Sequence, residues 1–280
     1  PVSYFSSAGK WGLSPGYAGK PFMDIARPVE TACLQCHASR LQPVPGSGNR
    51  YREPPFLEGG VSCERCHGQG GRHVAARGAG GPLKAGEIVN PAKLDAVRRD
   101  SICEQCHLTG AARVSRAGRT TASYKPGDRL SDHLAVFVWT SGAGGERAAT
   151  DHAEQLARSG CKRSAGESLA CISCHDPHSQ PAEAERTAFF RARCMNCHER
   201  RPCTETAANR EARGNDCSAC HMPKGRSREG EHVAYTDHSI PRRQQAAAAV
   251  ASGERELKSY WPGAGAERDL AIAYAGLGME

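Results

Sequence analysis

Eighteen cysteine and histidine residues of this chain lie in one short pattern, C-x-x-C-H. In 280 residues it occurs six times, at Cys33/Cys36/His37, Cys63/Cys66/His67, Cys103/Cys106/His107, Cys171/Cys174/His175, Cys194/Cys197/His198 and Cys217/Cys220/His221. A scrambled chain with the same cysteine and histidine content would contain the pattern only about 0.03 times. Two thiols followed directly by an imidazole are the attachment signature of c-type haem, in which both cysteines bind the haem and the histidine binds its iron.

Structural zinc is the alternative, because C-x-x-C pairs also build zinc sites. Zinc, however, has no need of a histidine directly after every second cysteine, and all six pairs have one. The sequence therefore predicts six covalently attached haems c. Their proximal iron ligands are expected to be His37, His67, His107, His175, His198 and His221.

The remaining histidines match the number of haems. Twelve histidines are present, and the six outside the motifs are His73, His133, His152, His178, His232 and His238. Six irons need six distal ligands, so we expect bis-histidine coordination, which gives a lower potential than Met/His coordination. Met195 and Met222 are poor competitors, because one lies inside a motif and the other directly follows a proximal histidine.

Distance along the chain limits which haem some distal histidines can reach. His178 follows the proximal His175 by three residues, too close to reach across the same porphyrin, and His73 follows His67 by six. Both are expected to serve neighbouring haems. His232 and His238 follow the last motif and are expected to fold back over two haems.

The composition predicts a protein that is mainly α, with extensive loops and little or no sheet. Aromatic residues make up only 6%, while glycine and proline number 31 and 17. Haems would supply the missing apolar mass, so a hexahaem cytochrome c domain is expected over residues 1–240, wrapped around a chain of six haems, with a helical segment over residues 241–280. Residues 42–60 are predicted to be a connector. Residues 134–139 are predicted to form a short buried strand or an extended segment against a porphyrin, and residues 151–158 a short helix.

Charge and hydropathy limit the partners and the location. The formal net charge is +7, but six haems bring about −12 through their propionates and leave about −5. The arginines are then expected to pair with propionates, and no nucleic-acid binding is predicted. No apolar run of 18 residues occurs, so no membrane span is expected. Haem c is attached outside the cytoplasm, which predicts a periplasmic or extracellular protein, and Pro1 is expected to be a processed or trimmed start.

Several segments resemble a known family. The stretch Gly60-Val-Ser-Cys63-Glu-Arg-Cys66-His67-Gly-Gln-Gly-Gly-Arg-His73 resembles cytochrome c554 and the octahaem hydroxylamine-oxidoreductase-like proteins. Residues 11–17, 101–108, 152–156, 171–178, 220–223 and 236–240 extend the likeness to multihaem c-type cytochromes with a tetratricopeptide-repeat region at the C-terminus. Residues 270–278 are similar to the first helix of such a repeat, with a generic amphipathic helix as the alternative.

Electron transfer is the function that these features predict, rather than catalysis. The expected partners are other redox proteins or copies of the chain itself, including an end-to-end homopolymer, an extracellular cytochrome nanowire. The alternative, implied by the resemblance, is an oxidoreductase for small nitrogen or sulfur compounds at one open-site haem. Such a site would need polar groups above the iron, and Tyr124 or Tyr235 could provide one.

Two cysteines lie outside the motifs, Cys161 and Cys203. In an oxidising compartment an even leftover pair predicts a disulfide. Closing this loop would stabilise the chain by about 4 kcal/mol in the chain-entropy model. Two separate thiols are the alternative.

Overall fold

The chain divides into two compact units, each with three of the six motifs. The computed structural model describes residues 2–5, 9–14, 17, 31–47, 49–82, 86–140, 151–200, 203–227, 230–242, 256–261, 263 and 267–278. Unit 1 comprises Pro1–Tyr4, Lys10–Gly142 and Gly253–Glu280, and unit 2 comprises Phe5–Gly9 and Ala143–Ser252. Gly253–Glu280 is thus grouped with the first half of the chain.

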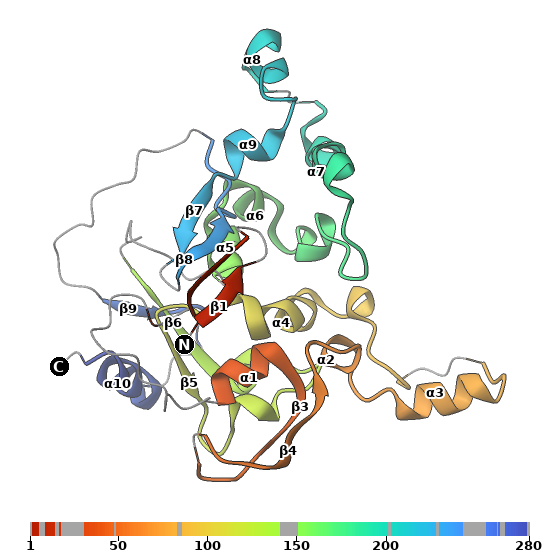
Figure 1. Ribbon diagram of the computed structural model, residues 1–280, viewed down its shortest axis with the longest axis vertical. Coiled ribbons are helices and arrows are strands. Elements are labelled where there is room, and N and C mark those ends of the chain that lie inside the picture. Colours follow the sequence, from red (N-terminus) through yellow and green to blue (C-terminus); the bar gives the residue numbers. More distant parts are fainter. Residues whose placement is uncertain are drawn as a thin grey trace. The chain divides into compact units, whose positions relative to one another are not determined.

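Unit 1 combines short helices with small antiparallel sheets (Figure 1). Its helices are α1 (Thr31–His37), α2 (Glu64–His67), α3 (Gly71–Gly78), α4 (Ala96–His107) and α10 (Glu267–Gly276). Its strands are β2 (Lys10–Leu13), β3 (Ala38–Pro43), β4 (Tyr51–Gly59), β5 (Ala112–Ser115), β6 (Leu134–Trp139) and β9 (Leu257–Ser259), and β1 (Val2–Phe5) pairs with β2.

The expectation of little or no sheet needs correction. The described residues form four small sheets, among them the three-stranded sheet β5-β6-β9. The segment predicted as a connector forms strand β4, which pairs with β3 and places Phe56 opposite Leu41. Pro54 and Pro55 gave a loop signal here, but proline is tolerated in an edge strand because one side of that strand needs no ladder donor. Of the two alternatives predicted for residues 134–139, a short buried strand or an extended segment, the structure has the strand, β6.

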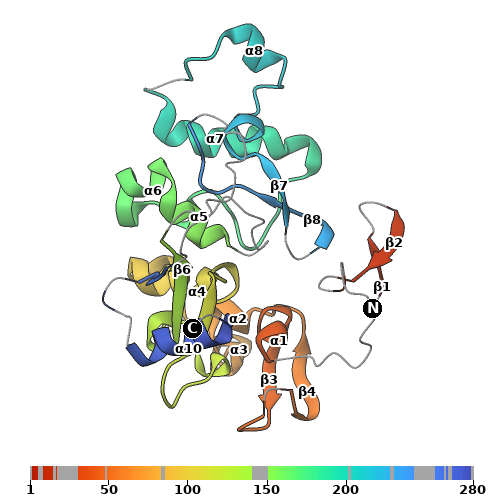
Figure 2. The same cartoon turned by 90° about the vertical axis from the view of Figure 1, so that its left-hand side faces the viewer.

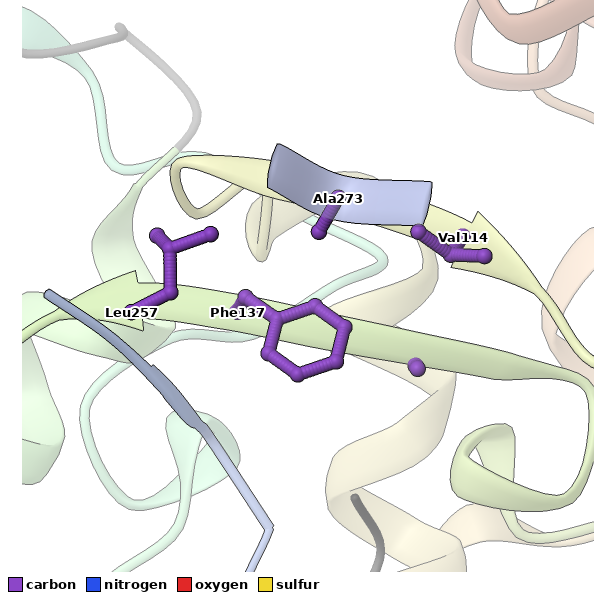
Figure 3. Packing of buried hydrophobic residues seen from close by; sticks show 5 residues of the cluster. Val114, Phe137, Leu257 and Ala273 are labelled. Atoms are coloured by element: carbon purple, nitrogen blue, oxygen red, sulfur yellow. The ribbon is translucent and has the colours of Figure 1, made fainter. Parts of the chain in front are cut away.

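Strand β6 carries the hydrophobic core of unit 1. Its residues from Leu134 to Val138 are all buried. Phe137 packs with Val114 of β5, Leu257 of β9 and Ala273 of α10, as Figure 3 shows. The C-terminal helix is therefore part of this core, and Arg116 near the end of β5 holds it through Asp269, with 2.7 Å between Nη1 and Oδ2.

Unit 2 has helices but almost no core of its own. Its elements are α5 (His152–Arg158), α6 (Gly160–Ala165), α7 (Arg186–His198), α8 (Ala207–Glu211), α9 (Cys217–His221), β7 (Lys224–Ser227) and β8 (Gly230–Thr236) (Figure 1; all but α9 are also labelled in Figure 2). Helix α5 confirms the short helix predicted over residues 151–158. Among the described side chains of this unit, Ala170 is the one apolar residue that is buried.

No helix in the described ranges is long and apolar enough to cross a membrane.

Candidate haem-binding sites

Every motif lies on a helical turn. Helices α1, α2 and α9 are built around motifs, α4 and α7 end in one, and the fourth motif begins with a 3₁₀ turn at Cys171–Ser173. In two motifs the histidine N–H donates to the carbonyl of the first cysteine, His67 to Cys63 and His175 to Cys171, both at 2.9 Å. Positions i, i+3 and i+4 of a helical turn share one face, so both thiols and the imidazole can point toward the same group.

The cysteines predicted to attach haem remain within reach of a large group. Cys63 and Cys197 are exposed, and the other motif cysteines whose side chains the structure describes are half-buried. Cys217 and Cys220 of the sixth motif belong to the half-buried set, and α9 carries both of them together with His221. None of these thiols is sealed in a protein core, so each can meet a haem vinyl group at the surface of its unit.

Aspartate side chains fix the start of two of these helices. Asp95 accepts a hydrogen bond from the backbone N–H of Arg98 at 3.0 Å and caps α4. Asp216 accepts from the N–H of Ser218 at 2.8 Å, directly before the sixth motif. These caps satisfy helix donors that have no partner within the helix, and in the sixth motif the cap fixes the turn that carries the ligands.

The variable residues of the motifs interlock the three sites of unit 1. The Arg65 guanidinium, inside the second motif, donates to the backbone carbonyl of Gln35, inside the first. The Gln105 amide, inside the third motif, donates to the carbonyl of Arg65 at 3.1 Å. Arg113 donates in turn to the carbonyl of Gln105 at 3.1 Å. The three C-x-x-C-H motifs of unit 1 are therefore next to one another.

In unit 1, Cys36 of the first motif lies next to Cys106 of the third, within hydrogen-bond reach. A hydrogen bond from the Cys106 thiol, together with the positive charge of Arg113, lowers the pKa of Cys36 to about 6 against the opposing effect of burial. The same contact, with burial, raises the pKa of Cys106. In unit 2, burial and the neighbouring Cys217 raise the pKa of Cys194 to about 11. These pKa values apply to the free thiols, because a cysteine in a thioether bond no longer titrates. The contacts themselves place cysteines of different motifs side by side.

Two of the predicted proximal histidines are oriented by backbone carbonyls. His67 Nδ1 lies 2.7 Å from the carbonyl oxygen of Val89, and His221 Nδ1 lies 3.0 Å from that of Pro241. A ring that donates from Nδ1 keeps a lone pair on Nε2, the arrangement that orients metal-binding histidines in proteins. Sequence reasoning did not identify either carbonyl, because backbone groups carry no signal in the sequence.

Three of the predicted ligands meet in unit 2. The rings of His175 and His238 have centroids 6.2 Å apart and planes inclined by 28°, and the ring of His152 meets His238 edge to face at 4.5 Å. His238 donates from Nδ1 to the carbonyl of Thr236 at 2.7 Å, and burial lowers its pKa, which favours the neutral ring that binds metals. Phe190 packs against His175 with centroids 5.6 Å apart.

The other predicted distal histidines are less closely associated with a motif. Nδ1 of His73 faces Oε2 of Glu87 at 3.9 Å, and His178, beside Asp176, has a side chain that is 75% exposed. The side chains of His232 and of Cys33 lie outside the described residues.

His133 has a different environment. It is buried, with Nδ1 2.8 Å from the Ser123 hydroxyl and Nε2 3.1 Å from Asp128 Oδ2. Tyr124 packs edge to face against its ring with centroids 5.7 Å apart. Because both ring nitrogens have polar partners, His133 would have to leave one of them to bind iron.

Cys161 and Cys203 are free thiols in the structure, so the expected disulfide is not formed. Cys161 is half-buried near motif cysteines, and burial followed by the charge of Cys197 raises its pKa. Cys203 is exposed.

We expect the haem-loaded protein to react with two equivalents of a thiol reagent, rapidly at Cys203 and slowly at Cys161. Cys203→Ser should remove the rapid phase, and a wild-type protein with no reactive thiol would show that the disulfide exists after all.

Comparison with known proteins agrees with this chemistry. Residues 19–68 match the family described as cytochrome c554 and c-prime, and residues 164–202 match the doubled CXXCH motif. Residues 19–68 contain the first and second motifs, and residues 164–202 contain the fourth and fifth. No curated protein and no solved structure matches the chain.

The third and sixth motifs lie outside both matched segments. Haem attachment at Cys103 and Cys106, and at Cys217 and Cys220, therefore stays a prediction that depends on the C-x-x-C-H pattern itself. The matched segments alone contain four motifs, two in each half of the chain, which is enough to show the class of protein. The chain is thus a cytochrome c554-like multihaem c-type cytochrome, with paired C-x-x-C-H motifs that bind haem c covalently.

Proposed function

We propose that the chain is a hexahaem electron-transfer protein whose haems, one for each motif, have histidine as both axial ligands. The observation that carries this proposal is the pair His175 and His238 in unit 2. An imidazole nitrogen lies about 2 Å from a bound metal, so two imidazoles on opposite sides of one iron hold their ring centroids about 6 Å apart. The observed separation is 6.2 Å. It supports His238 as the distal ligand of the haem attached at Cys171 and Cys174.

The residues fit haem in two further respects. The backbone carbonyls that accept from His67, His221 and His238 leave each Nε2 able to bind iron. Unit 2 has almost no buried apolar side chains of its own among its described residues, which suits a unit organised around a large apolar group. A bound haem supplies a reversible one-electron couple. Histidine pairs such as His175 and His238 would hold that iron from both sides and leave no position for a substrate.

Contacts between motifs support transfer from haem to haem. Cys36 contacts Cys106, and Cys194 contacts Cys217, so thioether-forming residues of different haems adjoin in both units. Haems whose attachment points touch have neighbouring edges, which favours hopping between them. The same proposal includes an exported location and the assembly of copies of the chain into a filament. The exposed His178 supports the filament, because a neighbouring copy can reach this residue.

The binding of carbon monoxide tests this proposal. Carbon monoxide binds ferrous haem only where an axial position is open or weakly held. The spectrum of the dithionite-reduced protein is expected to be the same with and without carbon monoxide. A change in about one-sixth of the haem absorbance would expose one open iron and contradict coordination of all six by histidine pairs.

The second candidate function is an oxidoreductase at a single open haem. It is favoured by His133, whose contacts with Ser123 and Asp128 would, if retained, leave one iron without a histidine from this set. The Tyr124 hydroxyl is buried and has no hydrogen-bond partner among the described residues. Burial raises its pKa most, followed by the charge of Asp128, with smaller effects from Cys103 and Cys66 of two motifs. A single open iron in the carbon monoxide experiment, with turnover of hydroxylamine or nitrite, would establish this function instead.

A further inference from the structure

Gln155 is a buried amide that the haem chemistry described so far does not use. It lies on α5 and is fully buried. Its Oε1 accepts a hydrogen bond from the backbone N–H of His238 at 2.8 Å. Its Nε2 is also buried and has no hydrogen-bond partner among the described residues. A buried amide donor without an acceptor destabilises the fold, so an amide in this position needs an acceptor.

Helix α5 presents two residues to the same ligand. His152 and Gln155 are three positions apart and therefore share a face of the helix. The His152 ring contacts the His238 ring, while the Gln155 carbonyl fixes the backbone of residue 238. With centroids only 4.5 Å apart, the rings of His152 and His238 are too close to bind opposite sides of one iron. His152 and His238 are therefore not the two ligands of one iron, and α5 contacts the His238 residue through both the His152 and the Gln155 side chains.

The segment that carries His238 is held at several points. Thr236 pairs with Lys224 between β8 and β7, and the N–H of Asp237 donates to the carbonyl of Pro223 at 3.0 Å. These bonds join the segment to the chain that follows the sixth motif. The bond to Gln155 joins the backbone of this segment to α5 at the ligand residue itself, beside the ring contact between His152 and His238.

We infer that Gln155 is the positioning residue for the distal ligand of the haem attached at Cys171 and Cys174. Its carbonyl fixes the backbone of His238, which sets where the imidazole meets the iron. Its Nε2 donates to a propionate of the same haem, because a carboxylate is the strongest acceptor that a haem brings into such a site. This inference rests on the proposed pairing of His175 with His238.

The test uses the haem-loaded protein and four variants. Gln155→Ala removes both contacts, and Gln155→Glu keeps an acceptor for the His238 N–H but places a second carboxylate near the propionate. His238→Ala removes the ligand itself. Arg158→Ala is the matched control, because Arg158 lies on the same helix with a side chain that is 38% exposed. Denaturing mass spectrometry checks that each variant keeps the haem content of the wild type.

The readouts are carbon monoxide binding, the low-spin electron paramagnetic resonance signals and the potential of each haem. His238→Ala is expected to open one iron, with about one-sixth of the reduced haem absorbance responding to carbon monoxide. Gln155→Ala should produce a response at the same haem, together with a shift of one low-spin signal. Gln155→Glu should leave that iron closed and lower the potential of one haem, because added negative charge stabilises the ferric state. Arg158→Ala should match the wild type.

Two different results separate the inference from the proposal beneath it. If His238→Ala opens an iron while both Gln155 variants keep the wild-type signals and potentials, Gln155 does not position the ligand, and the histidine pair stands. If His238→Ala leaves carbon monoxide binding unchanged, His238 is not the ligand and the proposed pairing itself is wrong. If Gln155→Ala loses haem, the potential measured in Gln155→Glu becomes the test of the role of Nε2. A haem potential in Gln155→Glu that equals the wild-type value contradicts that role.

Discussion

Without haem, residues 151–242 are expected to be unfolded, while the sheet β5-β6-β9 keeps measurable protection. Burying a large apolar side chain stabilises a fold by about 1.5–3 kcal/mol, and ordering each residue costs about 1–2 kcal/mol of conformational entropy. In unit 2, Ala170 is the one buried apolar side chain among the described residues, so the protein part alone cannot offset that cost. Unit 1 has a core around Phe137 and Leu134 that does not depend entirely on haem.

Hydrogen exchange measures this difference directly. The chain would be produced under conditions in which no haem is attached. Its amide exchange, followed by mass spectrometry, would be compared with that of the haem-loaded protein. Residues 151–242 should exchange at the rate of an unfolded chain, and β6 more slowly. Slow exchange throughout unit 2 of the haem-free chain would contradict a unit organised around its haems.

Arg116→Ala is expected to lower the free energy of unfolding of unit 1 by about 3 kcal/mol or more. The Asp269 side chain is only 3% exposed and pairs with Arg116 at 2.7 Å. Removing the arginine leaves a buried carboxylate with its weaker partner, Arg268, whose own side chain is 55% exposed. Arg116 also donates to the carbonyl of Ser131 at 3.0 Å, so the substitution removes that hydrogen bond together with the ion pair to α10.

The matched control is Arg268→Ala, which removes the exposed partner of the same carboxylate. It should cost no more than about 1 kcal/mol. The double variant Arg116→Ala/Asp269→Ala should recover part of the loss, because no buried charge is then left alone. Denaturant unfolding of the haem-loaded protein, followed by circular dichroism, measures all three. Equal losses for Arg116→Ala and Arg268→Ala would show that the C-terminal helix does not depend on the buried pair.

The chemistry of the sites could be predicted from the sequence, because it depends on residues that are close along the chain. A C-x-x-C-H pentapeptide contains both thiols and its proximal histidine, and one helical turn is enough to align them. Strand β6 was predictable for a similar reason, since its six consecutive apolar residues indicate a buried segment. The strand β4 was missed because Pro54 and Pro55 carry a strong loop signal, while its pairing with β3 depends on a cross-strand partner.

What the sequence could not predict depends on contacts between distant residues. Cys36 and Cys106 are 70 positions apart, and nothing in either motif indicates that they touch. The role of Gln155 was also missed, although its spacing of three residues from His152 places both on one helical face. A polar residue one turn from a candidate ligand is a usable signal, but only the fold shows that its carbonyl meets the backbone of His238.

The mass of the intact protein under denaturing conditions tests the central claim most directly. Covalently attached haem stays with the chain when the fold and the iron ligands are lost, so the mass counts the motifs that carry haem. We expect the mass of the 280-residue chain plus six haems. A mass corresponding to fewer than six haems in fully matured protein would show that at least one motif is not an attachment site, and would contradict a hexahaem electron-transfer protein.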